Sequence, residues 1–308
     1  MGSPAMSPTE DLLMVTGASG RLGQLVLREL IERQGVDPMK IVAITRTPER
    51  LNMWKERGVV VRRGDFNDEP LIVREAFRGG RRALIIASDD LPSRRKNIEN
   101  AIREAAEAGV KHILFTGTVT QPKDLPPFMG DLVEIEEKVL REIKGITYTV
   151  LGFNLWMETH LEFLRGEIAS GTLCTTTPTG KVAFISREDY AKACAAALTS
   201  TKELREKYEL TGPEALDRYK LAAVLSNAFN LPKPLEVRPI SPEELINRLT
   251  AEGMPNLTAH FWVEHIERAI NYGDMAAVGT GFFDLTGTKP ETFESFLKRT
   301  LEIYAPKK

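Results

Sequence analysis

Cysteine is scarce in this chain: Cys174 and Cys194 are the two cysteines among its 308 residues. Two cysteines cannot form a disulfide framework, and neither belongs to a Cys-x-x-Cys pair. The chain therefore fits a reducing compartment, and we expect a cytoplasmic protein.

The sequence also lacks an excess of one charge and a long hydrophobic run. Lys and Arg number 41 and Asp and Glu number 43, so the net charge is −2. This balance argues against a nucleic-acid partner and against a polybasic membrane anchor. No run of about 18 apolar residues is present to span a membrane. Residues 1–10 have neither the basic start nor the apolar core of a secretory signal, and we expect a flexible lead, native or left over from cloning.

Motifs for metal or nucleophilic catalysis are missing as well. The four histidines are His112, His160, His260 and His265. They form no His-Glu-x-x-His pattern and no cluster with cysteine, so no metal site is expected. No Gly-x-Ser-x-Gly nucleophile motif occurs either.

What is present, in the first half of the chain, is an alternation of short β-rich runs and helical patterns. The expected strands are 12–16, 41–45, 59–61, 83–87, 113–116 and 147–151, with helices that include 98–109 and 131–143. Such alternation predicts an α/β fold of the Rossmann type, a doubly wound parallel sheet covered on both faces.

The second half is punctuated by Gly, Pro and Thr and predicts a smaller, mixed α/β substrate subdomain. Its expected helices are 187–199, 217–229, 242–252, 256–272 and 291–303. We place a Rossmann domain at 11–153 and the subdomain at 154–308. Segments around 182–199 are expected to return to the first domain, with a strand near 182–185 rejoining the main sheet.

The strongest motif is the segment from Thr16 to Gly23, TGASGRLG, which follows a strand and opens a helix. Small residues let a backbone turn tightly and approach a pyrophosphate, whose charge the helix N-terminus stabilises. The predicted contacts are Gly17, Ser19, Gly20, Arg21, Leu22 and Gly23. The alternative is a tight strand-to-helix turn without a ligand.

The end of the second strand indicates which dinucleotide binds. NAD sites usually have an acidic residue there, whereas this chain has Arg46, followed by Arg50. Guanidinium groups suit a ribose 2′-phosphate, so NADP(H) is the expected coenzyme; alternatively, Arg46 is only a solvated charge. Asp65 and Phe66 suit the adenine, or form a turn with a core Phe. Ser88 is added to the predicted coenzyme contacts.

As a set, these segments resemble the NmrA-like family of atypical short-chain dehydrogenases. The resemblance covers residues 11–303 and includes AGVKHILFT (108–116), ITYTVLGFNLWMET (146–159) and REDYAKACAAAL (187–198). The family includes quinone reductases, a triphenylmethane-dye reductase, iminium reductases of alkaloid pathways and redox-sensing regulators. The resemblance implies an NADP(H)-dependent reductase with a small substrate-side subdomain.

The chain departs from ordinary short-chain dehydrogenases where they carry a Ser and a Tyr-x-x-x-Lys pair. Gly117 stands in the place of the Ser, and the nearest analogue of the pair is Glu134 with Lys138, one helical turn apart. We predict Lys138 and Glu134 as catalytic residues, with Lys138 and Phe153 also contacting the coenzyme. The alternative for both charged residues is an exposed helix face.

These departures favour an acceptor whose reduction needs no built-in acid. A ketone yields an alkoxide that must be protonated, whereas an iminium carbon yields a neutral amine directly. We expect hydride transfer to an imine, iminium or quinone-like substrate, an aromatic or cationic small molecule, in specialised metabolism and with possible ring closure. The predicted pocket residues are Thr118, Phe128, Asn154, Trp156 and Met157. The competing hypothesis is an NADP(H)-sensing regulator; in either case we expect a monomer or a homodimer.

Overall fold

The computed structural model describes residues 11–88, 90, 92–119 and 127–304, with the side chains of 127–129 left out. The predicted lead, 1–10, lies outside the described residues. The chain divides into two compact units. Unit 1 comprises 1–118, 127–152 and 191–208, and unit 2 comprises 119–126, 153–190 and 209–308.

Unit 1 is built on a seven-stranded sheet in the order β3-β2-β1-β4-β5-β6-β8. The strands are β1 (Leu12–Val15), β2 (Ile41–Thr45), β3 (Val60–Arg63), β4 (Gly80–Ile85), β5 (His112–Thr118), β6 (Thr147–Phe153) and β8 (Lys207–Leu210). The pairs from β3 through β5 are parallel, and Met14 of β1 lies opposite Val42 and Ala83. This architecture confirms the predicted Rossmann-type fold.

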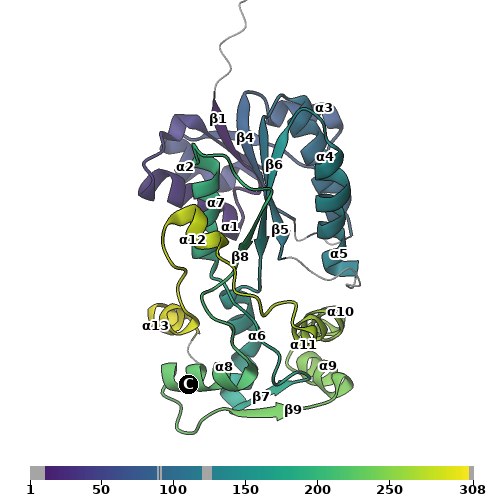
Figure 1. Cartoon of the computed structure of the whole chain (residues 1–308), viewed down its shortest axis with the longest axis vertical. Helices are drawn as coiled ribbons and strands as arrows, with labels where there is room; N and C mark the ends of the chain where they lie inside the picture. Colours follow the sequence, from purple (N-terminus) through teal and green to yellow (C-terminus); the bar gives the residue numbers. More distant parts are fainter. Residues whose placement is uncertain (1–10, 89, 91, 120–126, 305–308) are drawn as a thin grey trace, which may run out of the picture. The chain divides into compact units, whose positions relative to one another are not determined.

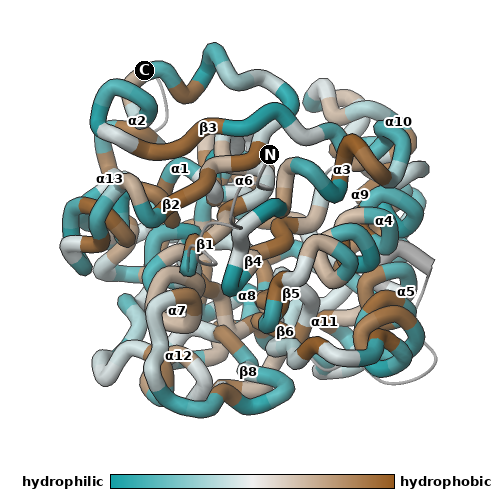
Figure 2. Tube along the Cα trace, turned by 90° about the horizontal axis from the view of Figure 1, so that it is seen from above, coloured by the Kyte–Doolittle hydropathy of each residue, from teal (hydrophilic) through white to brown (hydrophobic). Residues whose placement is uncertain are grey.

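Hydrophobic strands fix the centre of this sheet. All five residues of β2 are buried, as a strand covered on both faces requires. Figure 2 colours most of β1 and β2 as hydrophobic. Chain order changes direction beside β1, which has β2 on one side and β4 on the other, and this is the switch point at which doubly wound sheets bind ligands.

Helices cover both faces of the sheet in unit 1. Figure 1 shows α3 and α4 on one side and α1 and α2 on the other. The helical segments are α1 (Arg21–Arg28) with η1 (Glu29–Arg33), η2 (Pro38–Lys40), η3 (Pro48–Leu51), α2 (Asn52–Glu56), α3 (Pro70–Ala76), α4 (Arg94–Glu107), α5 (Pro127–Glu134) with η4 (Ile135–Leu140), and α7 (Arg187–Thr199).

Unit 2 combines helices with a two-stranded parallel sheet, β7 (Thr172–Thr175) and β9 (Glu236–Pro239). Its helical segments are α6 (Met157–Ser170), α8 (Arg218–Ala228), α9 (Pro242–Ala251), α10 (Asn256–Phe261), η5 (Trp262–Glu267), α11 (Arg268–Tyr272), α12 (Gly281–Thr286) and α13 (Phe293–Tyr304). A buried ion pair between Arg218 and Glu267 fastens α8 to η5. Over the described residues, no helix is both long and apolar enough to cross a membrane.

Three of the elements that differ from the sequence-based expectations concern the main sheet. The fourth strand begins at Gly80 rather than at the expected Ala83. The expected start was too late because the charged residues Arg81 and Arg82 did not resemble a buried strand. The seventh strand is β8, which was not predicted. The segment 182–185 does not rejoin the main sheet: Val182 pairs with Leu216 and Ile185 with Trp156 as isolated bridges.

Candidate functional site

The loop after β1 has the backbone that a phosphate-binding turn requires. Gly17 adopts a φ of +57°, a left-handed conformation that disfavours other residues. Gly23 lies against the turn so closely that an added Cβ would meet the carbonyl oxygen of Gly17 at 2.4 Å and the Cα of Ala18 at 2.6 Å. Only glycine fits there, and the loop therefore lies directly on the first turn of α1.

The N-terminus of α1 is open to a ligand. Gly17 and Gly20 are exposed, and Gly20, the N-cap residue, provides no side-chain cap for the helix. The first N–H groups of a helix have no intrahelical acceptor and carry partial positive charge. A cradle of small exposed residues in front of such donors fits the pyrophosphate of a dinucleotide.

Threonine hydroxyls hold this loop in register with the neighbouring strands. The Thr16 hydroxyl accepts a hydrogen bond from the Ile86 N–H at 3.0 Å, and the Thr116 hydroxyl accepts one from Ala87 at 2.8 Å. The Ser19 hydroxyl lies 2.7 Å from that of Thr45. The sequence analysis predicted a role for Ser19 but none for the threonine hydroxyls. Their position at or beside the carboxyl end of a strand was the one sign of such a role.

Arg46 and Arg50 follow β2 and are both exposed. Within the described part of the chain, neither makes a salt bridge or a side-chain hydrogen bond. The Thr47 N–H, next to Arg46, donates to the Thr45 hydroxyl at 3.1 Å, so the backbone at this strand end is tied to the phosphate loop through Ser19. Two guanidinium groups thus stand beside the loop with their donors available.

Asp65 and Phe66 come after β3 in a tight turn. One carboxylate oxygen of Asp65 accepts hydrogen bonds from the backbone and side-chain nitrogens of Asn67 at 3.0 and 3.1 Å. The ring of Phe66 stacks on Phe77, with centroids 6.3 Å apart. Both side chains are half-buried, and their contact with adenine remains a prediction. Ser88, after β4, accepts a hydrogen bond from the Asp90 N–H.

Glu134 and Lys138 form a surface ion pair on the helix α5–η4. The Lys138 ammonium lies 3.3 Å from Glu134, whose other oxygen lies 2.8 Å from Arg95. The Lys138 side chain is 59% exposed and that of Glu134 is 38% exposed. Their catalytic roles remain predictions, and this geometry by itself is that of a solvated helix face.

The absence of a serine at position 117 has a steric counterpart. A Cβ on Gly117 would meet the Val150 side chain at 2.6 Å, so β5 and β6 leave no room for a larger residue. A serine at position 117 would require the Val150 side chain or β6 to shift.

An aromatic cluster lies in unit 2, where the chain leaves β6. The rings of Phe153 and Trp156 stack with centroids 5.0 Å apart, and buried Tyr190 meets both edge-on. The Arg187 guanidinium lies 5.7 Å from the Trp156 ring centroid. Phe153 and Trp156 are half-buried, so part of each ring stays accessible.

The other predicted pocket residues are less accessible. Thr118, Asn154 and Met157 are buried, at 2%, 3% and 1% exposure. The Asn154 amide donates to the Met275 carbonyl at 2.9 Å, and its oxygen accepts from the Leu155 N–H. The Asn154 side chain therefore holds the backbone at Leu155 and Met275. Phe128 falls in α5, and its side chain lies outside the described residues.

Glu158 is a carboxylate close in sequence to this cluster. It accepts hydrogen bonds from the Arg187 N–H at 3.0 and 3.2 Å and so caps α7. Burial raises its pKa above the ordinary value, although the bonds to its carboxylate, among them those from Arg187, act in the opposite direction. Glu158 therefore stabilises the start of α7 at Arg187, whose guanidinium also lies over the Trp156 ring.

Comparison with known proteins finds one family across nearly the whole chain. The model of the NmrA-like family matches residues 9–297. Quinone oxidoreductase 2 of Escherichia coli is 29% identical over 273 residues, which covers 89% of this chain and 90% of the relative.

Two solved structures share the fold along the same length. Triphenylmethane reductase from Citrobacter, in complex with NADP(H), is 28% identical with a TM-score of 0.83, covering 94% of this chain and 99% of that one. The NADPH complex of quinone oxidoreductase QOR2 from Escherichia coli is 26% identical with a TM-score of 0.85, again covering 94% and 99%.

Proposed function

The chain belongs to the NmrA-like family, and from this premise we propose that it is an NADPH-dependent reductase of quinones and of cationic, electron-poor aromatic compounds. The observation that carries the proposal is the cradle formed by Gly17, Gly20 and Gly23 beside two exposed arginines. Relatives of the chain are named as a quinone oxidoreductase and a triphenylmethane reductase, and their solved structures hold NADPH and NADP(H), respectively.

The loop and the arginines would hold the coenzyme. The first-turn N–H groups of α1 would bind the pyrophosphate, and Arg46 and Arg50 the ribose 2′-phosphate. When bound, NADPH supplies a hydride. The threonine hydroxyls keep the loop and the end of β2 fixed, so that little ordering is needed when the coenzyme binds.

The proposed acceptors share one chemical property that fits this chain. Hydride addition to a quinone gives a hydroquinone anion stabilised by its aromatic ring, and addition to a triarylmethyl cation gives a neutral product. Neither needs the proton donor that an alkoxide needs. The chain has Gly117 in the place of the usual serine, so an acceptor that requires no built-in acid matches the residues present.

We assign the acceptor to the exposed parts of Phe153 and Trp156. Aromatic rings favour flat, electron-poor partners through stacking, and they bind cations through their negative faces. Cyclic iminium ions belong to the same class of acceptor. A role in specialised metabolism and a coupled ring closure are further proposals, and they rest on family resemblance. We also propose a cytoplasmic location, because the free cysteines Cys174 and Cys194 suit a reducing compartment.

The test is NADPH consumption by the purified protein with a benzoquinone, a cationic triarylmethane dye and a cyclic iminium salt. We expect turnover of the first two. Trp156→Leu should raise the KM for the dye about tenfold, the worth of one good stacking contact. Phe283→Leu, which changes an exposed ring elsewhere in unit 2, should leave it unchanged.

A protein that binds NADPH tightly but never consumes it across this panel would contradict the proposal. That result would favour the competing hypothesis of an NADP(H)-sensing regulator. A partner protein recovered only in the presence of one oxidation state of the coenzyme would then decide between them.

A further inference from the structure

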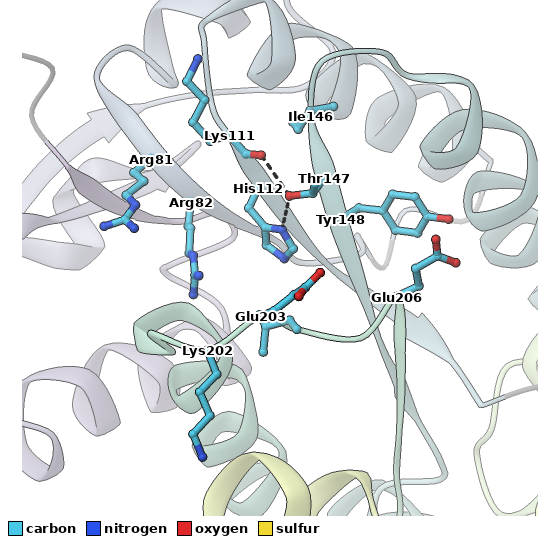
Figure 3. A pocket seen from close by; sticks show the side chains of 11 residues that line it. Arg81, Arg82, Lys111, His112, Ile146, Thr147, Tyr148, Lys202, Glu203 and Glu206 are labelled. Atoms are coloured by element: carbon cyan, nitrogen blue, oxygen red, sulfur yellow. Dashed lines mark hydrogen bonds between the residues drawn. The ribbon is translucent and has the colours of Figure 1, made fainter.

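A cavity lies in unit 1 at the edge of the sheet opposite the phosphate loop. It has a volume of about 480 Å³ and is lined by the first residues of β4, β5 and β6 and by the segment that leads into β8. Figure 3 shows Arg82, His112 and Glu203 around a common space, with Lys111 and Lys202 extending away from it. Because β1, β4 and β5 are parallel, this edge lies at the opposite ends of the strands from the loop at Gly17–Gly23.

Arg82 brings a half-buried cation to this cavity. Its Nη1 atom donates to the carbonyls of Ala197 and Leu198 at 2.9 and 3.3 Å, at the C-terminus of α7. Its Nε and Nη2 atoms have no partner among the described residues, and no described carboxylate pairs with the guanidinium. Nε and Nη2 form the edge with which arginine binds a carboxylate through two parallel hydrogen bonds.

His112 forms a fixed wall of the cavity. Its Nδ1 atom lies 2.7 Å from the Thr147 hydroxyl and its Nε2 atom 3.1 Å from the Thr149 hydroxyl. The Thr149 hydroxyl donates to the Arg205 carbonyl at 2.8 Å, so Nε2 carries the proton that Thr149 accepts. Burial and the charge of Arg82 lower the pKa of His112 to about 4, so the ring is neutral and does not compete for an anion.

Glu203 supplies the opposite charge in the same cavity. It comes from the segment between α7 and β8, and no salt bridge joins it to a cation in the described part of the chain. Glu203 and Arg82 thus line one cavity without pairing with each other. Two opposite charges that face a common space and leave each other unpaired are complementary to a ligand with both charges.

We propose that this cavity binds a small amino acid, a molecule with one carboxylate and one ammonium group. The carboxylate lies on the Nε and Nη2 edge of Arg82, and the ammonium lies on Glu203. Thr147 and Tyr148 also line the cavity. The site is separate from the reductase site, because it is built at the amino ends of the strands.

The experiment measures binding by ligand-observed NMR with NADPH present at saturation. One probe, 4-aminobutanoate, carries both charges; butanoate carries the carboxylate alone, and butylamine carries the ammonium alone. Two further amino acids, β-alanine and 6-aminohexanoate, vary the separation between the two charges. We expect one of the three amino acids to bind at least tenfold more tightly than butanoate or butylamine, since each charged group adds a charge-assisted hydrogen bond.

The variant Glu203→Gln should bind this amino acid only as tightly as it binds butanoate. Glu137→Gln is the matched control, because it is an exposed residue of the same unit outside the cavity. Butanoate that binds as tightly as the amino acids, or the absence of binding by every probe, would overturn the proposal. NADPH binding, followed in the same samples, reports separately on the coenzyme site.

Discussion

At the scale of single residues, Gly23 and Arg46 have different roles in the proposed coenzyme site. Gly23 acts by having no side chain, because the backbone of Gly17 and Ala18 occupies the space where a Cβ would lie. Arg46 acts through its charge, and its exposed guanidinium has no competing partner in the described chain. The first residue fixes the shape of the loop, and we propose that the second selects the 2′-phosphate.

Gly23→Ala should damage the loop rather than the sheet. The added methyl group would overlap backbone atoms that cannot move freely, so we expect a loss of about 1–3 kcal/mol in the free energy of unfolding. The affinity for NADPH should fall at least about tenfold. Urea denaturation and calorimetric titration measure the two effects.

The matched control is Gly130→Ala, a position in α5 where the added carbon meets no described atom within 4 Å. It should leave coenzyme affinity unchanged. Equal affinities for NADPH in the Gly23→Ala variant and the parent protein would show that this loop does not hold the coenzyme.

Arg46→Ser should change coenzyme preference. Loss of a charge-assisted hydrogen bond to the 2′-phosphate is expected to lower kcat/KM for NADPH by about 10- to 100-fold. The value for NADH should stay the same, because NADH has no such phosphate. Initial rates with a soluble benzoquinone measure both, and Arg78→Ser, another exposed arginine of unit 1, serves as the control. A parallel loss with both coenzymes would contradict the role of Arg46.

The sequence predicted the glycine loop and the arginines because these features are local. The loop needs only glycine spacing between a strand and a helix, and both are visible in consecutive residues. The anchoring bonds of Thr16 and Thr116 were missed because they go to Ile86 and Ala87, which lie far away along the chain. A hydroxyl whose partner is set by the packing of strands leaves no local pattern.

At the scale of elements, α6 and β7 are joined by a buried carboxyl group. Glu167 of α6 accepts a hydrogen bond from the Cys174 N–H of β7 at 3.0 Å. Burial raises the pKa of Glu167 to about 7, with Arg218 acting in the opposite direction. This junction is therefore sensitive to pH within a range in which ordinary glutamates are already ionised.

Glu167→Gln should flatten the dependence of stability on pH. The pKa is raised in the folded state, so the contribution of Glu167 is complete below about pH 4.5 and is lost as the pH rises through about 7. The unfolding free energy of the variant relative to the parent should thus increase by up to about 3 kcal/mol across this range. Urea denaturation at both ends of the range measures it. A constant difference would mean that the carboxyl stays ionised in the fold.

Elements that are buried on both faces were predictable, and elements at the margins were not. The continuous apolar run of β2 was found at its observed bounds, Ile41–Thr45. The strand β8 was missed because its four residues, KYEL, include two charges and resemble a surface loop. Helix 131–143 was expected as one element, whereas the structure has α5 followed by the π-helical segment η4, and periodicity does not distinguish the two.

At the scale of the whole molecule, coenzyme binding and folding stability are linked. A ligand that binds only the folded state stabilises it, by about 2.7 kcal/mol at a hundred times its Kd. We expect NADPH to raise the thermal midpoint more than NADH at equal concentration. The Gly23→Ala variant should show a much smaller response, and identical responses to both coenzymes would contradict the selectivity for the 2′-phosphate.

Two properties of the whole chain remain predictions. The first is the division into a domain at 11–153 and a subdomain at 154–308. It is a prediction about which parts fold independently, and the two compact units describe packing only. A monomer or a homodimer was expected from the sequence, and light scattering on the purified protein measures this directly.

Neither unit is a continuous stretch of chain. The sheet of unit 1 takes its last strand from residues that begin at Lys207, after 153–190 have been given to unit 2. A ribosome must therefore release about two thirds of the polypeptide before this sheet can be completed. No single truncation yields either half intact, so attempts to graft the coenzyme-binding half onto another enzyme would have to rejoin three pieces rather than cut once.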